Sequence, residues 1–160
     1  MARSVDRFVD VLSSAGPQAA LDYLNAGVPH RYTSLYRLSK STLINLVLCD
    51  KLGQVRPEFL AEVPFHDSFC QFVLRDGALR TDDSSTDSRL DGSPYQGVII
   101  SYHGAPIVWA GEVWGALCHF DFGVMSLPDE EFELLKACAA AWSTAVPVLV
   151  SADMPLGDAY

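Results

Sequence analysis

The sequence has few basic residues. Its 160 residues include 11 Lys or Arg against 20 Asp or Glu, which gives a formal net charge of −9. The only lysines are Lys40, Lys51 and Lys136, and none of them lies in a basic run. Nucleic acids and anionic lipid surfaces are bound through clustered cationic side chains. We therefore expect neither nucleic acid nor a membrane among the partners of this chain.

Long apolar runs are also missing. No stretch reaches the roughly 18 apolar residues that a membrane-spanning helix needs. The N-terminus alternates apolar and charged side chains, unlike the continuous apolar core of a signal peptide. We therefore expect a cytoplasmic protein. Because 49% of its residues are hydrophobic, the chain can bury one core, and we expect one domain.

The four cysteines and four histidines show no metal-binding pattern. No two cysteines have the C-x-x-C spacing of a zinc ribbon or a thioredoxin-like motif. Compact ligand spacing is also absent among the residues best suited to a metal, which are His66, His103, His119 and Asp121. We expect half-buried thiols, no metal and no identified cofactor, and we keep haem as the less favoured alternative because histidine serves many other roles.

Local patterns predict helices at both ends of the chain. Apolar residues recur at helical spacing after Ser4, a typical N-cap, and stop at Gly16, after which Pro17 begins a second short helix. Near the C-terminus, Ser126 and Asp129 have the spacing of a capping box before a long amphipathic helix. We divide the chain into three segments: helices in 1–28, a main body in 29–150, and a flexible tail in 151–160.

Between these helices, period-two alternation predicts two hairpins. The first joins strands at residues 32–38 and 41–50, and the second joins strands at 100–109 and 112–122. A short helix that stops at Gly77 and a polar, turn-rich loop separate the hairpins. Hairpin-linked strands with helices at the chain ends indicate an antiparallel sheet in an α+β fold.

Three runs of the sequence, 65–90, 101–122 and 127–142, together resemble a GAF domain. The resemblance is carried by a Ser-x-Cys, an Asp-x-x-x-Asp-x-Arg loop, a Ser-Tyr-x-Gly-x-Pro strand, a Gly-x-Leu-Cys strand and an acidic helix start. These motifs fall on Ser68 and Cys70; Asp83, Asp87 and Arg89; Ser101, Tyr102, Gly104 and Pro106; Gly115, Leu117 and Cys118; and Asp129 to Leu135.

The resemblance implies a central antiparallel sheet with the N- and C-terminal helices on one face. On the other face it implies a small-ligand pocket under loops and short helices. It also implies a homodimer through the terminal helices and a sensory role. The cyclic-nucleotide pattern and the bilin attachment site of specialised relatives are not found in this sequence. We therefore expect a stand-alone or excised sensor that acts on a separate signalling protein.

The pleat of the last predicted strand divides its side chains between the two faces of the sheet. We expect Trp114, Cys118 and Phe120 to face the terminal helices, and His119 and Asp121 to face the pocket. His119 is therefore the leading pocket residue, and a buried structural histidine is an equally weighted alternative.

The register of the second hairpin depends on its turn. If Ala110-Gly111 is a simple two-residue turn, Tyr102 lies opposite His119 and His103 lies opposite Cys118. A slip of one residue would exchange these partners.

We expect a small anionic or amphipathic molecule to bind in the pocket and to reshape the loop from Thr81 to Gly97. Asp83 and Asp87 are expected to brace that loop. The predicted ligand-binding residues are Phe69, Cys70, Arg89, Tyr102, His119 and Asp121.

An enzyme is the less favoured alternative. Relatives with the same fold reduce free methionine (R)-sulfoxide with cysteines in this pocket. By that resemblance Cys70 or Cys118 would attack the sulfoxide as a thiolate, and a second cysteine would form the resolving disulfide. The cysteines here do not match the closely spaced set of that branch, and the expected orientation of Cys118 toward the helices weakens the case further.

Overall fold

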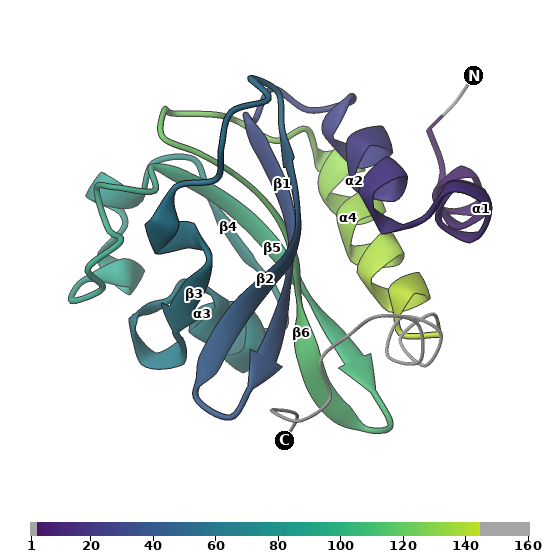
Figure 1. Ribbon diagram of the computed structural model, residues 1–160. Coiled ribbons are helices and arrows are strands. Elements are labelled where there is room, and N and C mark those ends of the chain that lie inside the picture. The colour runs from purple at the N-terminus through teal and green to yellow at the C-terminus, as the bar shows by residue number, and fades with distance from the viewer. Residues whose placement is uncertain (1–2, 145–160) are drawn as a thin grey trace.

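The computed structural model describes residues 3–144, and its main elements follow the predicted order (Figure 1). The helices are α1 (Val5–Ala15), α2 (Pro17–Asn25), α3 (Cys70–Asp76) and α4 (Asp129–Trp142). The strands are β1 (Tyr32–Ser39), β2 (Thr42–Asp50), β3 (Glu62–Pro64), β4 (Leu79–Thr81), β5 (Ser101–Trp109) and β6 (Glu112–Asp121). In this part of the chain no helix is long and apolar enough to cross a membrane. The predicted boundary at residue 150 and the tail at 151–160 lie outside the described residues.

The six strands form one antiparallel sheet in the order β3-β2-β1-β6-β5-β4. The two predicted hairpins, β1–β2 and β5–β6, make its centre and are joined by pairing of β1 with β6. The edge strands β3 and β4 were not predicted. Each has three residues, which is too short for alternation to be recognised in the sequence.

Helices and loops cover opposite faces of this sheet (Figure 1). We call the side covered by α1, α2 and α4 the helix face, and the side covered by α3 and the irregular segments the pocket face. Each face buries its own apolar cluster. The helix-face cluster includes Phe8, Leu24, Leu35, Leu117, Leu135 and Trp142. This arrangement confirms the predicted α+β fold with the terminal helices together on one face.

The ends of the helices follow local signals in most cases. Ser4 accepts a hydrogen bond from the Arg7 N–H at 3.1 Å, as expected of an N-cap. α3 ends as predicted at Gly77, which adopts a φ of 85° that favours glycine. The capping box predicted for α4 is wrong. Because Pro128 is the N-cap, Ser126 lies before the first turn, and its hydroxyl donates to Asp82 Oδ2 at 3.1 Å.

A β-bulge near the tip of the β5–β6 hairpin corrects the predicted register. The two-residue turn at Ala110 and Gly111 is confirmed, with Trp109 opposite Glu112. The pairing then shifts between Ile107 and Val108, which leaves Trp114 as the extra residue on β6.

Beyond the bulge every pair is displaced by one residue. Tyr102 lies opposite Phe120, and His103 lies opposite His119. The predicted pairs of Tyr102 with His119 and of His103 with Cys118 are therefore wrong, and the slip by one residue is what the chain adopts.

The bulge also overturns most of the predicted division of β6 between the faces. Trp114 packs in the helix-face cluster as expected, but Leu117 joins it there. Cys118 and Phe120 belong to the pocket-face cluster. Their predicted orientation toward the helices is wrong, because the extra residue shifts the phase of the pleat.

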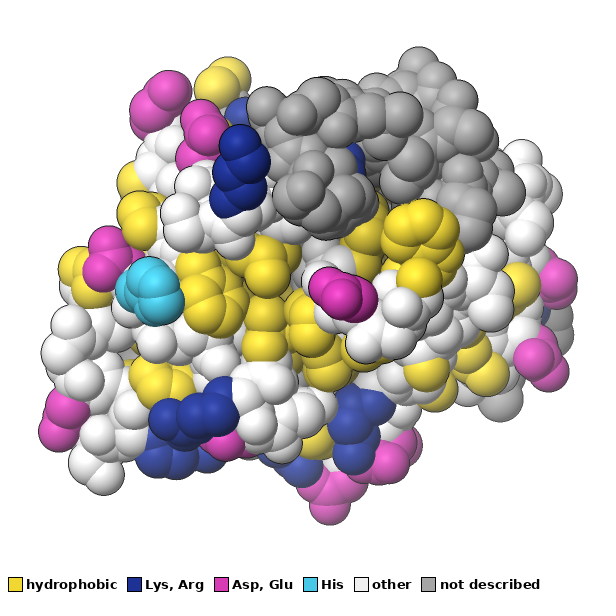
Figure 2. All heavy atoms as spheres, turned by 90° about the horizontal axis from the view of Figure 1, so that it is seen from below, with side chains coloured by type: hydrophobic (Ala, Val, Ile, Leu, Met, Phe, Trp, Pro, Cys, Tyr) yellow, Lys and Arg dark blue, Asp and Glu magenta, His cyan; other side chains and the backbone are white. Residues whose placement is uncertain are grey.

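Apolar side chains are exposed at the end of the molecule that carries the β1–β2 and β5–β6 turns. Figure 2 views the molecule from this end, and apolar side chains lie in the middle of the view with charged side chains around them. Val108, near the tip of β5, is 42% exposed.

Candidate functional site

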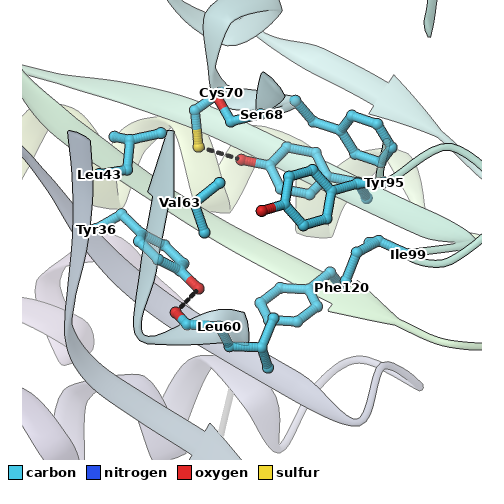
Figure 3. A pocket seen from close by; sticks show the side chains of 11 residues that line it. Tyr36, Leu43, Leu60, Val63, Ser68, Cys70, Tyr95, Ile99 and Phe120 are labelled. Atoms are coloured by element: carbon cyan, nitrogen blue, oxygen red, sulfur yellow. Dashed lines mark hydrogen bonds between the residues drawn. The ribbon is translucent and has the colours of Figure 1, made fainter. Parts of the chain in front are cut away.

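The pocket face encloses a cavity of about 40 Å³ (Figure 3). Its floor comes from β1, β2, β5 and β6, and its roof comes from β3, the start of α3 and the segment before β5. Eleven residues line it, and they are mainly aromatic or aliphatic: Tyr36, Leu43, Leu60, Val63, Ser68, Phe69, Cys70, Tyr95, Ile99, Tyr102 and Phe120. The floor residues lie on one face because alternation places Tyr102 and Phe120, which pair across β5 and β6, on the same side.

Most polar groups around the cavity are bonded to the protein itself. The Tyr36 hydroxyl donates to the Leu60 carbonyl at 2.7 Å, and the Ser68 hydroxyl donates to the Phe65 carbonyl at 2.7 Å. The Tyr102 hydroxyl and the Cys70 thiol lie 3.0 Å apart. Glycine at position 104 makes room for this contact, because a Cβ there would lie 2.9 Å from the Tyr102 hydroxyl.

The groups that could ionise in this cavity are held neutral. Burial raises the pKa of the Cys70 thiol and raises that of Cys118 to about 11. Burial likewise raises the pKa values of Tyr36 and Tyr102 well above 10. Because the thiolate is the reactive form of cysteine, this environment disfavours nucleophilic chemistry at neutral pH.

Three of the six predicted ligand residues, Phe69, Cys70 and Tyr102, line the cavity. Arg89 lies elsewhere. Its guanidinium forms an ion pair with Asp87 at 2.5 Å and donates to the Arg80 carbonyl at 2.9 Å. The expected bracing role of Asp87 is confirmed by its hydrogen bond from the Arg89 N–H, and Asp83 likewise accepts from the Ser85 N–H.

Asp121 and His119 are also outside the cavity. Asp121 accepts the Arg31 N–H at 2.7 Å and the Gly123 N–H at 2.8 Å, so its carboxylate joins the end of β6 to the chain before β1. His119 is fully buried on the helix face, where its Nδ1 lies 2.6 Å from the Thr33 hydroxyl. Its predicted orientation toward the pocket is wrong, because the extra residue of the bulge shifts the phase of the pleat in β6.

His119 belongs to a histidine cluster that the sequence did not reveal. His30, His103 and His119 are each fully buried, and the ring of His30 lies 4.9 Å from that of His103 and 5.6 Å from that of His119. The pairing of His103 with His119 across β5 and β6 would have indicated part of it, had the bulge been recognised.

Hydrogen bonds assign the protons in this cluster. Because the Asp82 carboxylate only accepts, the His103 Nε2–H donates to it at 3.0 Å. His103 Nδ1 then accepts from the Nε2–H of His30, also at 3.0 Å. Burial, followed by the nearby His103, lowers the pKa of His30 to about 4, and burial lowers that of His119 well below 6.5. The cluster is therefore neutral at pH 7.

This cluster is not arranged as a metal centre. Within residues 3–144 no group of three or more His, Cys, Asp or Glu side chains could hold a metal ion. The hydrogen bonds that occupy both ring nitrogens of His103 are consistent with that finding.

Comparison with known proteins rests on structure alone, because no family model and no curated protein matches the sequence. The GAF domain of a phosphoenolpyruvate-protein phosphotransferase from Acinetobacter matches with a TM-score of 0.73 at 14% identity, over 94% of each chain. A free methionine-R-sulfoxide reductase from Neisseria meningitidis, in complex with its substrate, matches with a TM-score of 0.72 at 13% identity, over 93% of this chain and 89% of that one.

A third similar structure is a bacteriophytochrome from R. palustris. It has a TM-score of 0.71 at 15% identity, over 94% of this chain and 38% of that one. Sensory domains and a reductase are thus matched about equally well, so the likeness does not choose between them. What these matches show is that this chain has the GAF fold.

Proposed function

We propose that this chain is a sensory domain that binds a small molecule in the cavity on the pocket face. The observation that best supports it is a partly open, largely apolar space between the sheet and an irregular roof, because small-molecule sites are concave and lined mainly by apolar side chains. The neutral state of the Cys70 and Cys118 thiols favours binding over catalysis.

The size of the cavity suggests how binding is signalled. An engineered cavity of about 150 Å³ holds benzene, whereas this one measures about 40 Å³. A ligand as large as benzene therefore requires the roof to move outward. Such a ligand binds the open roof better than the closed one and shifts the population between them. Of the roof segment before β5, Tyr95 falls within the loop from Thr81 to Gly97, which we expected to respond to ligand, and Ile99 lies two residues beyond it.

A variant that fills the cavity tests this proposal. Ile99 lines the cavity and is 6% exposed, whereas Val55 is 93% exposed and serves as the control. Native mass spectrometry of the purified chain should detect a retained small molecule in the wild type and in Val55→Trp, and none in Ile99→Trp. The same bound molecule in Ile99→Trp, or a wild type that neither retains a molecule nor is stabilised by any probe of the cavity, would contradict the proposal.

We also infer that occupancy is passed on through a homodimer formed by the terminal helices, and from it to a separate signalling protein. Support comes from α1, whose Val9 is apolar and 38% exposed. Multi-angle light scattering measures the oligomeric state directly, and a monomeric mass at micromolar concentration would contradict this inference.

A reductase acting on free methionine (R)-sulfoxide is the second candidate. One observation favours it: Cys118 belongs to the same buried cluster on the pocket face as Cys70, whose thiol lies 3.0 Å from the Tyr102 hydroxyl. In such a reaction the two thiols would form a disulfide, while the sulfoxide oxygen leaves as water and the substrate becomes the thioether. Their raised pKa values count against it.

An activity assay separates the two candidates. With methionine (R)-sulfoxide and dithiothreitol as the reductant, a sensor shows no turnover above background. Turnover that disappears in Cys70→Ser but persists in Cys49→Ser would overturn the purely sensory function. Cys49 is the matched control because it packs on the helix face.

A further inference from the structure

The cavity carries information about the charge of its ligand. Among the described residues, none that lines it is charged, and its ionisable side chains are phenols and a thiol. Removing an ion from water without an opposite charge costs several kcal/mol. The cationic group that we expected to meet an anionic ligand, Arg89, is paired with Asp87 outside the cavity. A charged ligand would therefore have no partner here.

One polar group of the lining is left for a ligand. The hydroxyls of Tyr36 and Ser68 donate to backbone carbonyls, and that of Tyr102 contacts the Cys70 thiol. The Tyr95 hydroxyl has no hydrogen-bond partner in the part of the chain that the structure describes, and it points into the cavity (Figure 3). Burial raises its pKa, so it remains a neutral donor.

From these two observations we infer that the cavity takes an uncharged, mainly apolar molecule with one hydrogen-bond acceptor, which the Tyr95 hydroxyl binds. The inference rests on the proposed function and specifies its ligand class. Apolar contact comes from the aromatic and aliphatic walls, and orientation comes from the single donor. Tyr95 lies in the roof segment, so the same hydrogen bond connects the ligand to the part of the protein that must move.

Three probes of matched size test the charge and the hydrogen bond separately. Acetophenone is uncharged and has one carbonyl acceptor. Ethylbenzene lacks that acceptor, and benzoate replaces the methyl group of acetophenone with a charged oxygen. Isothermal titration calorimetry, supported by saturation-transfer NMR, should show that acetophenone binds most tightly. Ethylbenzene should bind roughly three- to ten-fold more weakly, and benzoate roughly 100-fold more weakly or not at all.

The variant Tyr95→Phe isolates the proposed donor, because it removes the hydroxyl and keeps the ring. It should weaken the binding of acetophenone by the same three- to ten-fold and leave the affinity for ethylbenzene unchanged, roughly as expected for the loss of one hydrogen bond. A loss that affects both probes equally would overturn the role of Tyr95.

The remaining outcomes distinguish the ligand class from the function itself. Benzoate binding as tightly as acetophenone would overturn the uncharged class and leave a ligand-binding sensor in place. In Ile99→Ala the cavity is widened. If none of the three probes binds either the wild type or this variant, both the uncharged ligand class and the proposed function are overturned.

Discussion

The two faces of the sheet bury polar groups in opposite ways. On the helix face, His30, His103 and His119 are fully buried and are connected to the surface through Asp82, whose side chain is 52% exposed. On the pocket face, phenols and thiols surround a space of about 40 Å³. Ionisable side chains are therefore buried on both faces, as hydrogen-bonded imidazoles on one and as phenols and thiols on the other.

This difference shows that residue type is a poor guide to which face holds the cavity. The histidines and Asp121 are chemically versatile residues, yet their hydrogen bonds join the segment before β1 to β5 and β6. The site is marked by unfilled space and by one unpaired hydroxyl, that of Tyr95. Both are properties of the packing and not of the sequence pattern.

Truncating a leucine on each face should give the largest contrast. Leu117 on the helix face and Leu43 in the cavity wall are both fully buried. Leu117→Ala leaves a new void in a filled core and should lower the free energy of unfolding by about 4 kcal/mol. Leu43 already borders open space and has fewer contacts to lose, so Leu43→Ala should cost about 2 kcal/mol. Urea unfolding followed by circular dichroism measures both, and equal losses would deny that the pocket face is less tightly packed.

Acid should destabilise the helix face first. His30 has a pKa near 6.5 when unfolded and about 4 when folded, so the unfolded chain binds its proton more readily. The neutral His30 contributes about 3 kcal/mol to the free energy of unfolding above pH 6.5. This contribution is lost as the pH falls toward 4. The charged and titratable groups around it are His103 and Lys51, which lower its pKa, Asp82 and Asp121, which raise it, and His119, whose ring lies 5.6 Å away.

The control for this pH dependence is the fourth histidine, His66, which is exposed. Urea unfolding between pH 7 and pH 4 should show a smaller loss in His30→Gln than in the wild type, and an unchanged loss in His66→Gln. The pKa of Asp87 is lowered to about 2, so its protonation changes the free energy of unfolding only below pH 4, outside this pH range. If the free energy of unfolding fell equally with pH in all three proteins, His30 would be excluded as the source of the acid sensitivity.

The parts of this fold that the sequence predicted are those with local signals. Gly77, which ends α3, and Gly111, in the turn of the second hairpin, adopt positive φ angles of 85° and 80° that favour glycine. The long helix at Asp129–Trp142 is set by periodicity. Each of these can be recognised without knowing what packs against it.

The site was predicted only in part because its geometry depends on contacts between distant segments. β6 is buried on both faces over most of its length, so polarity does not reveal which side chains face the cavity. The bulge at Trp114 then reverses the phase of the pleat. Phe69 and Cys70 were found because they belong to a local motif, whereas the orientation of His119 required the tertiary register.

The smallest expected effect concerns Arg89, which the sequence placed among the ligand residues. Its guanidinium is half exposed and pairs with Asp87 outside the cavity. Arg89→Gln should therefore lower the free energy of unfolding by under about 1 kcal/mol, as for other exposed ion pairs. It should also change the dissociation constant of acetophenone by less than about two-fold, whereas Tyr95→Phe weakens it more. If Arg89→Gln instead abolished acetophenone binding, or if benzoate bound the wild type and not this variant, the charged loop would be part of the site and the contrast between the two faces would fail.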